Sequence, residues 1–117
     1  MYESWAYDRE TYAGLTRYQM TEKLRIAYEE AASLIGAKIT RSGEAFRLFE
    51  ETYGREPSLY QDMNHQSLLG AYLSACVHYS TITGKRASDN MYKIEGIDSA
   101  MAAKIRRIAD LISFPEE

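Results

Sequence analysis

The chain has 117 residues, a formal net charge of −3, 45% hydrophobic residues and 26% charged residues. This length limits it to one domain or part of one, and the composition is typical of a globular chain rather than a disordered one. The sequence contains no basic run with interleaved aromatic residues, so we predict no nucleic-acid partner. No apolar run approaches the roughly 20 residues that span a bilayer, so we predict no membrane partner.

The first predicted elements are a strand and a helix. Residues 1–7 alternate apolar and polar side chains and are rich in aromatic residues, which predicts a short strand. Residues 8–19 have no clear period and are expected to form a loop or an irregular helix. Residues 20–35 follow the helical period, with Thr21 as the expected N-cap and Gly36 as the stop. The apolar side chains that this period places on one face are Leu24, Ala27, Tyr28, Ala31, Leu34 and Ile35.

A second strand-like segment follows at residues 37–40, and Ser42 is expected to cap a second helix that Gly54 ends. The apolar stripe of this helix consists of Ala45, Phe46, Phe49 and Tyr53. The order strand, helix, strand predicts a parallel βαβ unit. Because two parallel strands do not form a stable sheet by themselves, we expect such a unit to need further strands.

Residues 55–64 form a predicted loop, and a third helix is expected at residues 66–82, closed by Gly84. Its apolar face consists of Leu69, Tyr72, Leu73, Cys76 and Tyr79. A polar, irregular stretch at residues 85–96 precedes a last helix, which Asp98 or Ser99 caps and Pro115 ends. Its inward residues are Met101, Ala102, Ile105, Ile108, Ala109 and Ile112. The pattern fits a helix-rich α/β fold with few short parallel strands, or a small helical bundle.

Asp62 and His65 are the residues whose spacing points to chemistry. In a turn, a carboxylate three residues before a histidine can reach one ring nitrogen, fix the tautomer and stabilise the imidazolium. The alternative is a helix cap, in which Asp62 or Asn64 caps the third helix and His65 lies in its first turn. A metal site is not predicted, since two histidines and the single Cys76 lack the paired spacing of zinc ligands. We likewise predict no cofactor and a buried, inert thiol at Cys76.

The sequence from Asp62 to His65, with the helix that follows and the Thr83-Gly84 pair, resembles the last block of SGNH (GDSL-like) hydrolases. The resemblance is strongest to an uncharacterised bacterial branch of unknown function. Residues 3–7 resemble the tryptophan-bearing strand and loop of that branch, and residues 35–46 resemble its short strand and next helix. The similarity covers nearly the whole chain in order.

This resemblance implies the C-terminal part of a flavodoxin-like three-layer α/β/α fold, and hydrolysis of a small ester through a serine acyl-enzyme. Carried over to this chain, it makes His65 the general base and Asp62 its orienting carboxylate. Trp5 is a candidate substrate-binding residue, because open α/β folds place ligands at the carboxyl ends of their strands. The alternative for Trp5 is a core or interface aromatic residue.

The family's nucleophile lies in a Gly-Asp-Ser block, and neither this block nor the family's oxyanion-hole glycine and asparagine blocks are found in the sequence. Acyl transfer by this mechanism requires both a nucleophile and oxyanion donors. We therefore expect residues 1–117 to be a single partial domain, inactive alone, that associates with a missing N-terminal half or with a copy of itself. The alternative function is a non-catalytic, α-rich interaction module.

Overall fold

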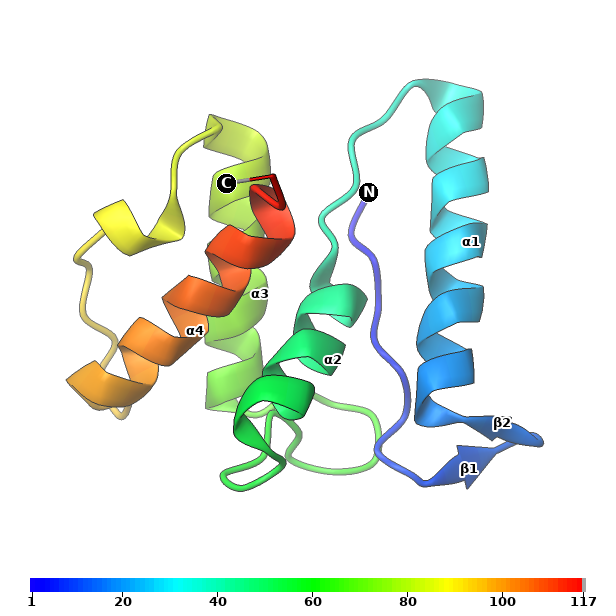
Figure 1. Ribbon diagram of the computed structural model, residues 1–117, viewed down its shortest axis with the longest axis horizontal. Helices are drawn as coiled ribbons and strands as arrows, with labels where there is room; N and C mark the ends of the chain where they lie inside the picture. Colours follow the sequence, from blue (N-terminus) through cyan, green and yellow to red (C-terminus); the bar gives the residue numbers. More distant parts are fainter. Residues whose placement is uncertain (117) are drawn as a thin grey trace.

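The computed structural model describes residues 1–116. They form β1 (Thr11–Tyr12), β2 (Leu15–Thr16), α1 (Arg17–Ile35), α2 (Ser42–Tyr53), α3 (Leu68–Thr83), the 3-10 helix η1 (Ala87–Asp89) and α4 (Ser99–Ser113). Figure 1 shows α1 on one side and α3 and α4 on the other, with α2 and the first residues of the chain between them. The prediction of a helix-rich α/β fold with few short strands is confirmed. Among residues 1–116, no helix has the length and apolar content needed to cross a bilayer.

The two segments predicted as parallel strands meet at a single parallel bridge, between Tyr2 and Thr40. The Glu3 N–H donates to the Thr40 carbonyl at 2.9 Å, and the Thr40 N–H donates to the Met1 carbonyl at 2.7 Å. The parallel pairing predicted from the strand–helix–strand order is therefore present but very short. It brings the start of the chain alongside the residues that lead into α2.

The loop or irregular helix expected at residues 8–19 is instead an antiparallel hairpin of β1 and β2 followed by the start of α1. Ala13 and Gly14 connect the strands, with φ of 52° and 79°. Two successive positive φ angles are the pattern of the type I′ turn, whose twist suits a two-residue hairpin. The usual Asn-Gly or Asp-Gly pair is absent, so the sequence carried only a weak signal for this turn.

Helix α1 begins earlier than its apolar period indicated, because Thr16 rather than Thr21 is the N-cap. The Thr16 hydroxyl accepts from the Gln19 N–H at 3.1 Å, and the Gln19 side chain accepts from the Thr16 N–H at 2.9 Å. This reciprocal pair is a capping box. Thr21 lies inside the helix, buried, with its hydroxyl donating to the Arg17 carbonyl.

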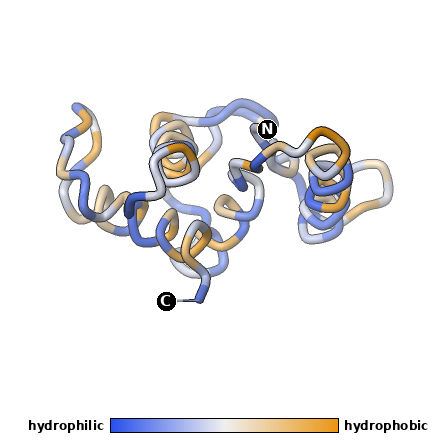
Figure 2. Tube along the Cα trace, turned by 90° about the horizontal axis from the view of Figure 1, so that it is seen from above, coloured by the Kyte–Doolittle hydropathy of each residue, from blue (hydrophilic) through white to orange (hydrophobic). Residues whose placement is uncertain are grey.

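The apolar face expected to point inward on α1 is half-buried at Leu24, Tyr28 and Ala31 and uncovered toward the end of the helix. Leu34 is 87% exposed and Ile35 is 71% exposed, whereas Met20, Thr21 and Ala32 are buried. The prediction for Leu34 and Ile35 was wrong because periodicity identifies an apolar stripe but not what covers it. Figure 2, seen from above, shows α1 standing apart from the bundle of α3 and α4.

The core lies between α2, α3 and α4, and here the predicted faces of α2 and α4 are confirmed, whereas on α3 the cluster includes Val77 and not the predicted Tyr79. Each helix contributes its apolar stripe to one buried cluster, which includes Ala45, Phe46, Phe49, Leu73, Cys76, Val77, Ile105, Ile108 and Ala109. Helix α3 is capped by Ser67, and α4 is capped by Asp98 as predicted. Gly70 brings α3 so close to the loop before it that an added Cβ would lie 2.2 Å from the Leu59 carbonyl oxygen.

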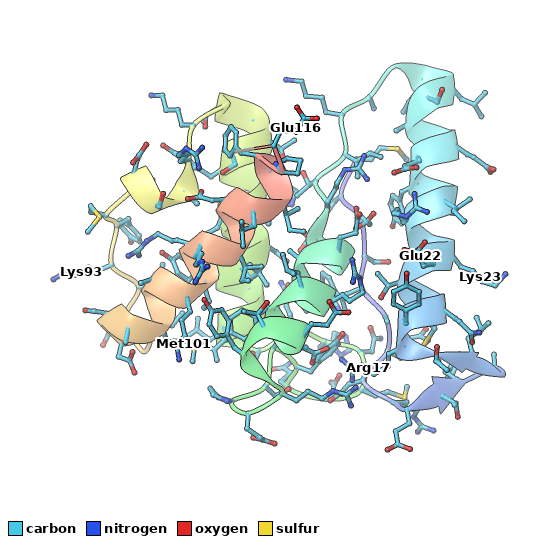
Figure 3. All side chains as sticks on the ribbon, viewed as in Figure 1. Arg17, Glu22, Lys23, Lys93, Met101 and Glu116 are labelled. Atoms are coloured by element: carbon cyan, nitrogen blue, oxygen red, sulfur yellow. The ribbon has the colours of Figure 1, made fainter. Side chains whose placement is uncertain are left out.

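Arg17, the first residue of α1, contacts both α2 and the loop before α3. Its guanidinium forms ion pairs with Asp8 and with Glu50 of α2. It also lies over the ring of Tyr60, 5.3 Å from the centroid. Figure 3 labels Arg17 at the foot of α1, close to α2. The sequence did not single out this residue, because its partners are far from it along the chain.

Candidate functional site

The predicted site residues lie in a tight turn between the loop after α2 and the start of α3. The Asp62 Oδ1 atom accepts hydrogen bonds from the N–H groups of Asn64 at 2.8 Å and His65 at 2.6 Å. The Gln61 N–H closes the turn by donating to the His65 carbonyl at 2.9 Å. An aspartate that binds backbone N–H groups two and three residues further on stabilises such a turn locally. The short spacing in the sequence is therefore sufficient to form this turn.

The second carboxylate oxygen of Asp62 binds the ring of His65. The His65 Nδ1 atom lies 2.8 Å from Asp62 Oδ2, and the two side chains are 68% and 53% exposed. The backbone N–H groups of His65 and Asn64, followed by the His65 ring, lower the pKa of Asp62 to about 2. Asp62 is therefore ionised at neutral pH. An ionised carboxylate at this position favours a proton on Nδ1 and leaves Nε2 able to accept one.

The alternative reading of this segment as a helix cap is wrong. Helix α3 begins at Leu68, and its N-cap is Ser67, whose hydroxyl accepts from the Gly70 N–H at 3.3 Å. Asp62 directs its carboxylate at the turn and at His65 instead. The carboxylate and the imidazole are thus brought together by the turn and not by the helix.

The turn is anchored to the first residues of the chain. The Trp5 indole N–H donates to the Asn64 carbonyl at 2.8 Å, and the Asp8 N–H donates to the Met63 carbonyl at 2.7 Å. The Trp5 ring is stacked on Phe46 of α2, with centroids 4.8 Å apart and planes 13° apart. Trp5 therefore connects the core to the Asp62–His65 turn, because its ring stacks on Phe46 and its indole N–H binds Asn64. Sequence reasoning did not foresee this anchoring.

An apolar groove of about 460 Å³ begins beside the turn and runs between the first residues of the chain and α1. Its walls include Trp5, Leu15, Met20 and Leu24, and Asn64 lies at the edge next to the turn. Asp62 and His65 do not line this groove, although His65 directly follows Asn64. The structure therefore places Trp5 in a groove wall close to the two residues. Its substrate-binding role remains a prediction.

Within residues 1–116 the His65 ring forms a hydrogen bond to Asp62 alone. Ser67, the serine nearest to His65 in the sequence, donates its hydroxyl to the Ser58 carbonyl at 2.8 Å and also caps α3. The Ser67 hydroxyl is therefore already engaged in two structural hydrogen bonds. The part of the chain that the structure describes also brings together no group of three or more His, Cys, Asp or Glu residues able to hold a metal ion.

Cys76, the single cysteine, and His78, the second histidine, both lie in α3, away from this turn. Cys76 is buried in α3, where burial raises the pKa of its thiol to about 11. An unionised thiol is a poor nucleophile. His78 of α3 binds the Thr40 hydroxyl through Nδ1 at 2.9 Å and makes an edge contact with the Tyr2 ring. His78 thus supports the short parallel pairing between the start of the chain and residues 38–40.

No protein-family model matches the sequence, and no curated protein is significantly similar to it. Among solved structures, the crystal structure of a DUF4886 family protein from Bacteroides uniformis is similar, with a TM-score of 0.84 and 26% sequence identity. The similarity covers 100% of this chain and 48% of that one. The chain therefore has the fold of about half of a structure from an uncharacterised bacterial family.

Proposed function

We propose that this chain supplies the acid–base half of an SGNH-type serine hydrolase site, with His65 as the general base and Asp62 as its orienting carboxylate. The observation that carries the proposal is the double use of the Asp62 carboxylate. One oxygen closes the turn by accepting two backbone N–H groups, and the other holds His65 Nδ1 at 2.8 Å. A base held in one tautomer by an ionised carboxylate is the arrangement that activates a serine hydroxyl.

The chemistry that follows is ester hydrolysis in two steps. A serine hydroxyl supplied from outside this chain attacks the ester carbonyl carbon while its proton passes to His65 Nε2. Asp62 stabilises the imidazolium, which then protonates the departing alkoxide and leaves an acyl-enzyme. Water attacks the acyl-enzyme while losing a proton to Nε2, and the imidazolium then returns that proton to the departing serine oxygen, which releases the acid and restores the serine and the neutral histidine. The proposed substrates are small esters.

The test is a chimera in which this chain replaces the matched half of the Bacteroides uniformis protein. We expect the chimera to hydrolyse p-nitrophenyl acetate, and His65→Ala to reduce turnover on the order of 100-fold or more. The chain alone should show no turnover that depends on His65. His78→Ala is the matched control, because His65 and His78 are the chain's two histidines and His78 lies away from the turn.

A folded chimera without turnover would contradict the proposal, as would turnover that survives His65→Ala. In that case the alternative, a non-catalytic α-rich interaction module, gains weight. The observation that favours this alternative is the exposed apolar stripe of α1 that includes Leu34 and Ile35.

A further inference from the structure

The first turn of α2 is capped by a side chain from the start of the chain. The N-cap residue of the helix is Arg41, whose side chain forms no cap hydrogen bond. The first N–H groups of a helix need acceptors from outside it. The Glu44 N–H finds one in Oε1 of Glu3, which lies 3.1 Å away and 41 positions earlier in the sequence. Glu3 therefore supplies the cap that α2 lacks locally.

Close packing fixes Glu3 in this position. A Cβ added at Gly43 would lie 2.2 Å from the Ser4 carbonyl oxygen and 3.1 Å from Oε1 of Glu3, so only a glycine allows this approach. On its other side the Glu3 N–H donates to the Thr40 carbonyl at 2.9 Å. The backbone at residues 3 and 4 is thus held between the first turn of α2 and residues 38–40.

Residues 5–8 connect this cap to the acid–base turn. Trp5 and Asp8 donate hydrogen bonds to the carbonyls of Asn64 and Met63, the two residues between Asp62 and His65. Figure 1 shows the start of the chain passing α2 and ending beside the loop before α3. Both contacts to the turn therefore lie within five residues of Glu3 on one segment. Loss of the cap frees one end of the segment that holds the turn.

The cap is sensitive to its charge, because the carboxyl group is buried and only half satisfied. Among residues 1–116, Oε2 of Glu3 has no hydrogen-bond partner. Burial raises the pKa of Glu3 to about 7, opposed by the N–H groups of Glu44 and Gly43 and by the Arg41 guanidinium, whereas the Glu44 carboxylate adds to the rise. Arg41 is itself paired with Glu44 and with Glu29 of α1. A charge on Glu3 is therefore poorly compensated in this position.

We infer that Glu3 is a positioning residue for the acid–base turn, which acts through residues 4–8 and releases this segment when it ionises. The neutral carboxyl group keeps Oε1 as an acceptor for the α2 N–H group. The ionised group gains hydration when the segment opens. The catalytic consequence of this coupling rests on the proposed function, whereas the coupling itself depends only on hydrogen bonding and burial.

Proton linkage sets the direction and size of the effect. The pKa of Glu3 is about 7 in the closed segment and returns to 4.5 when the side chain reaches water. The ratio of open to closed segments should therefore rise as the pH increases from 4.5 to 7, by up to about 300-fold, and stay constant above pH 7. Below pH 4.5 the carboxyl group is neutral in both states, so the ratio no longer depends on it.

The experiment is NMR hydrogen exchange on the full chain between pH 4.5 and 8. The Trp5 indole N–H, which is unambiguous because the chain has one tryptophan, and the Asp8 amide report the two contacts to the turn. After correction for intrinsic exchange, we expect the opening constant of both to rise with pH as described. Glu3→Gln keeps an acceptor and does not titrate, so its opening constant should not change with pH. Glu3→Ala removes the acceptor and should raise the opening constant at least about 10-fold at pH 4.5.

Val77→Ala is the matched control for global stability. Val77 is 1% exposed in the core on α3, and it contacts neither the cap nor the turn in the hydrogen-bond network described above. The variant should speed exchange of the core amides of α3 while leaving the opening constants at Trp5 and Asp8 unchanged. An equal increase at these two positions would mean that they exchange only by global unfolding, which would overturn the inference.

Turnover of p-nitrophenyl acetate by the chimera tests the catalytic consequence. Glu3→Ala should lower kcat about 10-fold with little change in KM, and Glu3→Gln should restore most of it. An opening constant that does not depend on pH in the wild type, or a kcat that Glu3→Ala leaves unchanged, would overturn the positioning role. A chimera without turnover contradicts the proposed function alone, because the exchange measurements on the chain still decide whether Glu3 controls the segment.

Discussion

The indole nitrogen of Trp5 lies 2.8 Å from the backbone carbonyl oxygen of Asn64 and donates a hydrogen bond to it. This bond joins residues that are 59 positions apart in the sequence. It holds the turn of Asp62 and His65 against the start of the chain, while the indole ring stacks on Phe46 in the core. The position of the turn therefore depends on an aromatic residue that is not part of the acid–base pair.

Replacing Trp5 with Phe should remove this hydrogen bond while keeping an aromatic ring against Phe46. We expect the free energy of unfolding to fall by about 1 kcal/mol, the usual net value of one hydrogen bond. Trp5→Ala, which also removes the ring, should cost about 3 kcal/mol or more. Urea unfolding measures both. No loss in Trp5→Phe would show that the hydrogen bond contributes nothing measurable, and equal losses in the two variants would show that the ring contact adds nothing to it.

Asp62→Asn should change the tautomer of neutral His65. In the wild type we expect the proton on Nδ1, because the ionised carboxylate of Asp62 accepts it at 2.8 Å. A neutral amide is a weaker acceptor, so the variant should shift the population toward the Nε2–H tautomer. Long-range ¹H–¹⁵N NMR distinguishes the two forms, and His78 in the same spectrum is the internal control. An Nε2–H tautomer in the wild type would contradict the proposed role of Asp62.

Glu3 should make stability depend on pH. It is 1% exposed, and burial, opposed by hydrogen bonds from the N-terminal N–H groups of α2, raises its pKa from 4.5 to about 7. A carboxyl group whose pKa is raised by folding stabilises the protein fully below pH 4.5, and this contribution is lost as the pH rises to 7. The shift corresponds to a loss of roughly 3 kcal/mol.

Glu3→Gln should remove this part of the pH dependence, because the amide keeps an acceptor for the α2 N–H groups without titrating. The measurement is the free energy of unfolding of both proteins between pH 4.5 and 8. Other carboxyl groups also titrate in this range, so the informative quantity is the difference between wild type and variant. A difference that stays constant across this range would rule out Glu3 as the source.

Gly70→Ala should destabilise the protein through a direct clash. The added Cβ would lie 2.2 Å from the Leu59 carbonyl oxygen and 3.0 Å from the Phe46 ring. Because one neighbour is backbone, α3 must shift, and we expect a loss of about 2 to 3 kcal/mol in urea unfolding. Gly36→Ala is the matched control: its Cβ meets open space, and only its φ of 66° is unfavourable. A smaller loss at Gly70 than at Gly36 would contradict this account.

Local sequence patterns were sufficient to predict much of the helical core. The stripes of α2 and α4, the Asp98 cap and the glycine stop after α3 were predicted, because each depends on residues within a few positions of one another. The β1–β2 hairpin and the true start of α1 were missed. An Ala-Gly turn is not a strong hairpin signal, and the apolar period of α1 begins after its capping box.

The sequence by itself determined the closeness of Asp62 and His65, because a three-residue spacing and two backbone hydrogen bonds form that turn locally. Only the tertiary structure decided where the turn lies, through the bond between Trp5 and Asn64, and which apolar residues are covered. The physical reason is that burial depends on what packs against a helix. Periodicity shows that Leu34 lies on an apolar face, but only the arrangement of neighbouring elements leaves that face open.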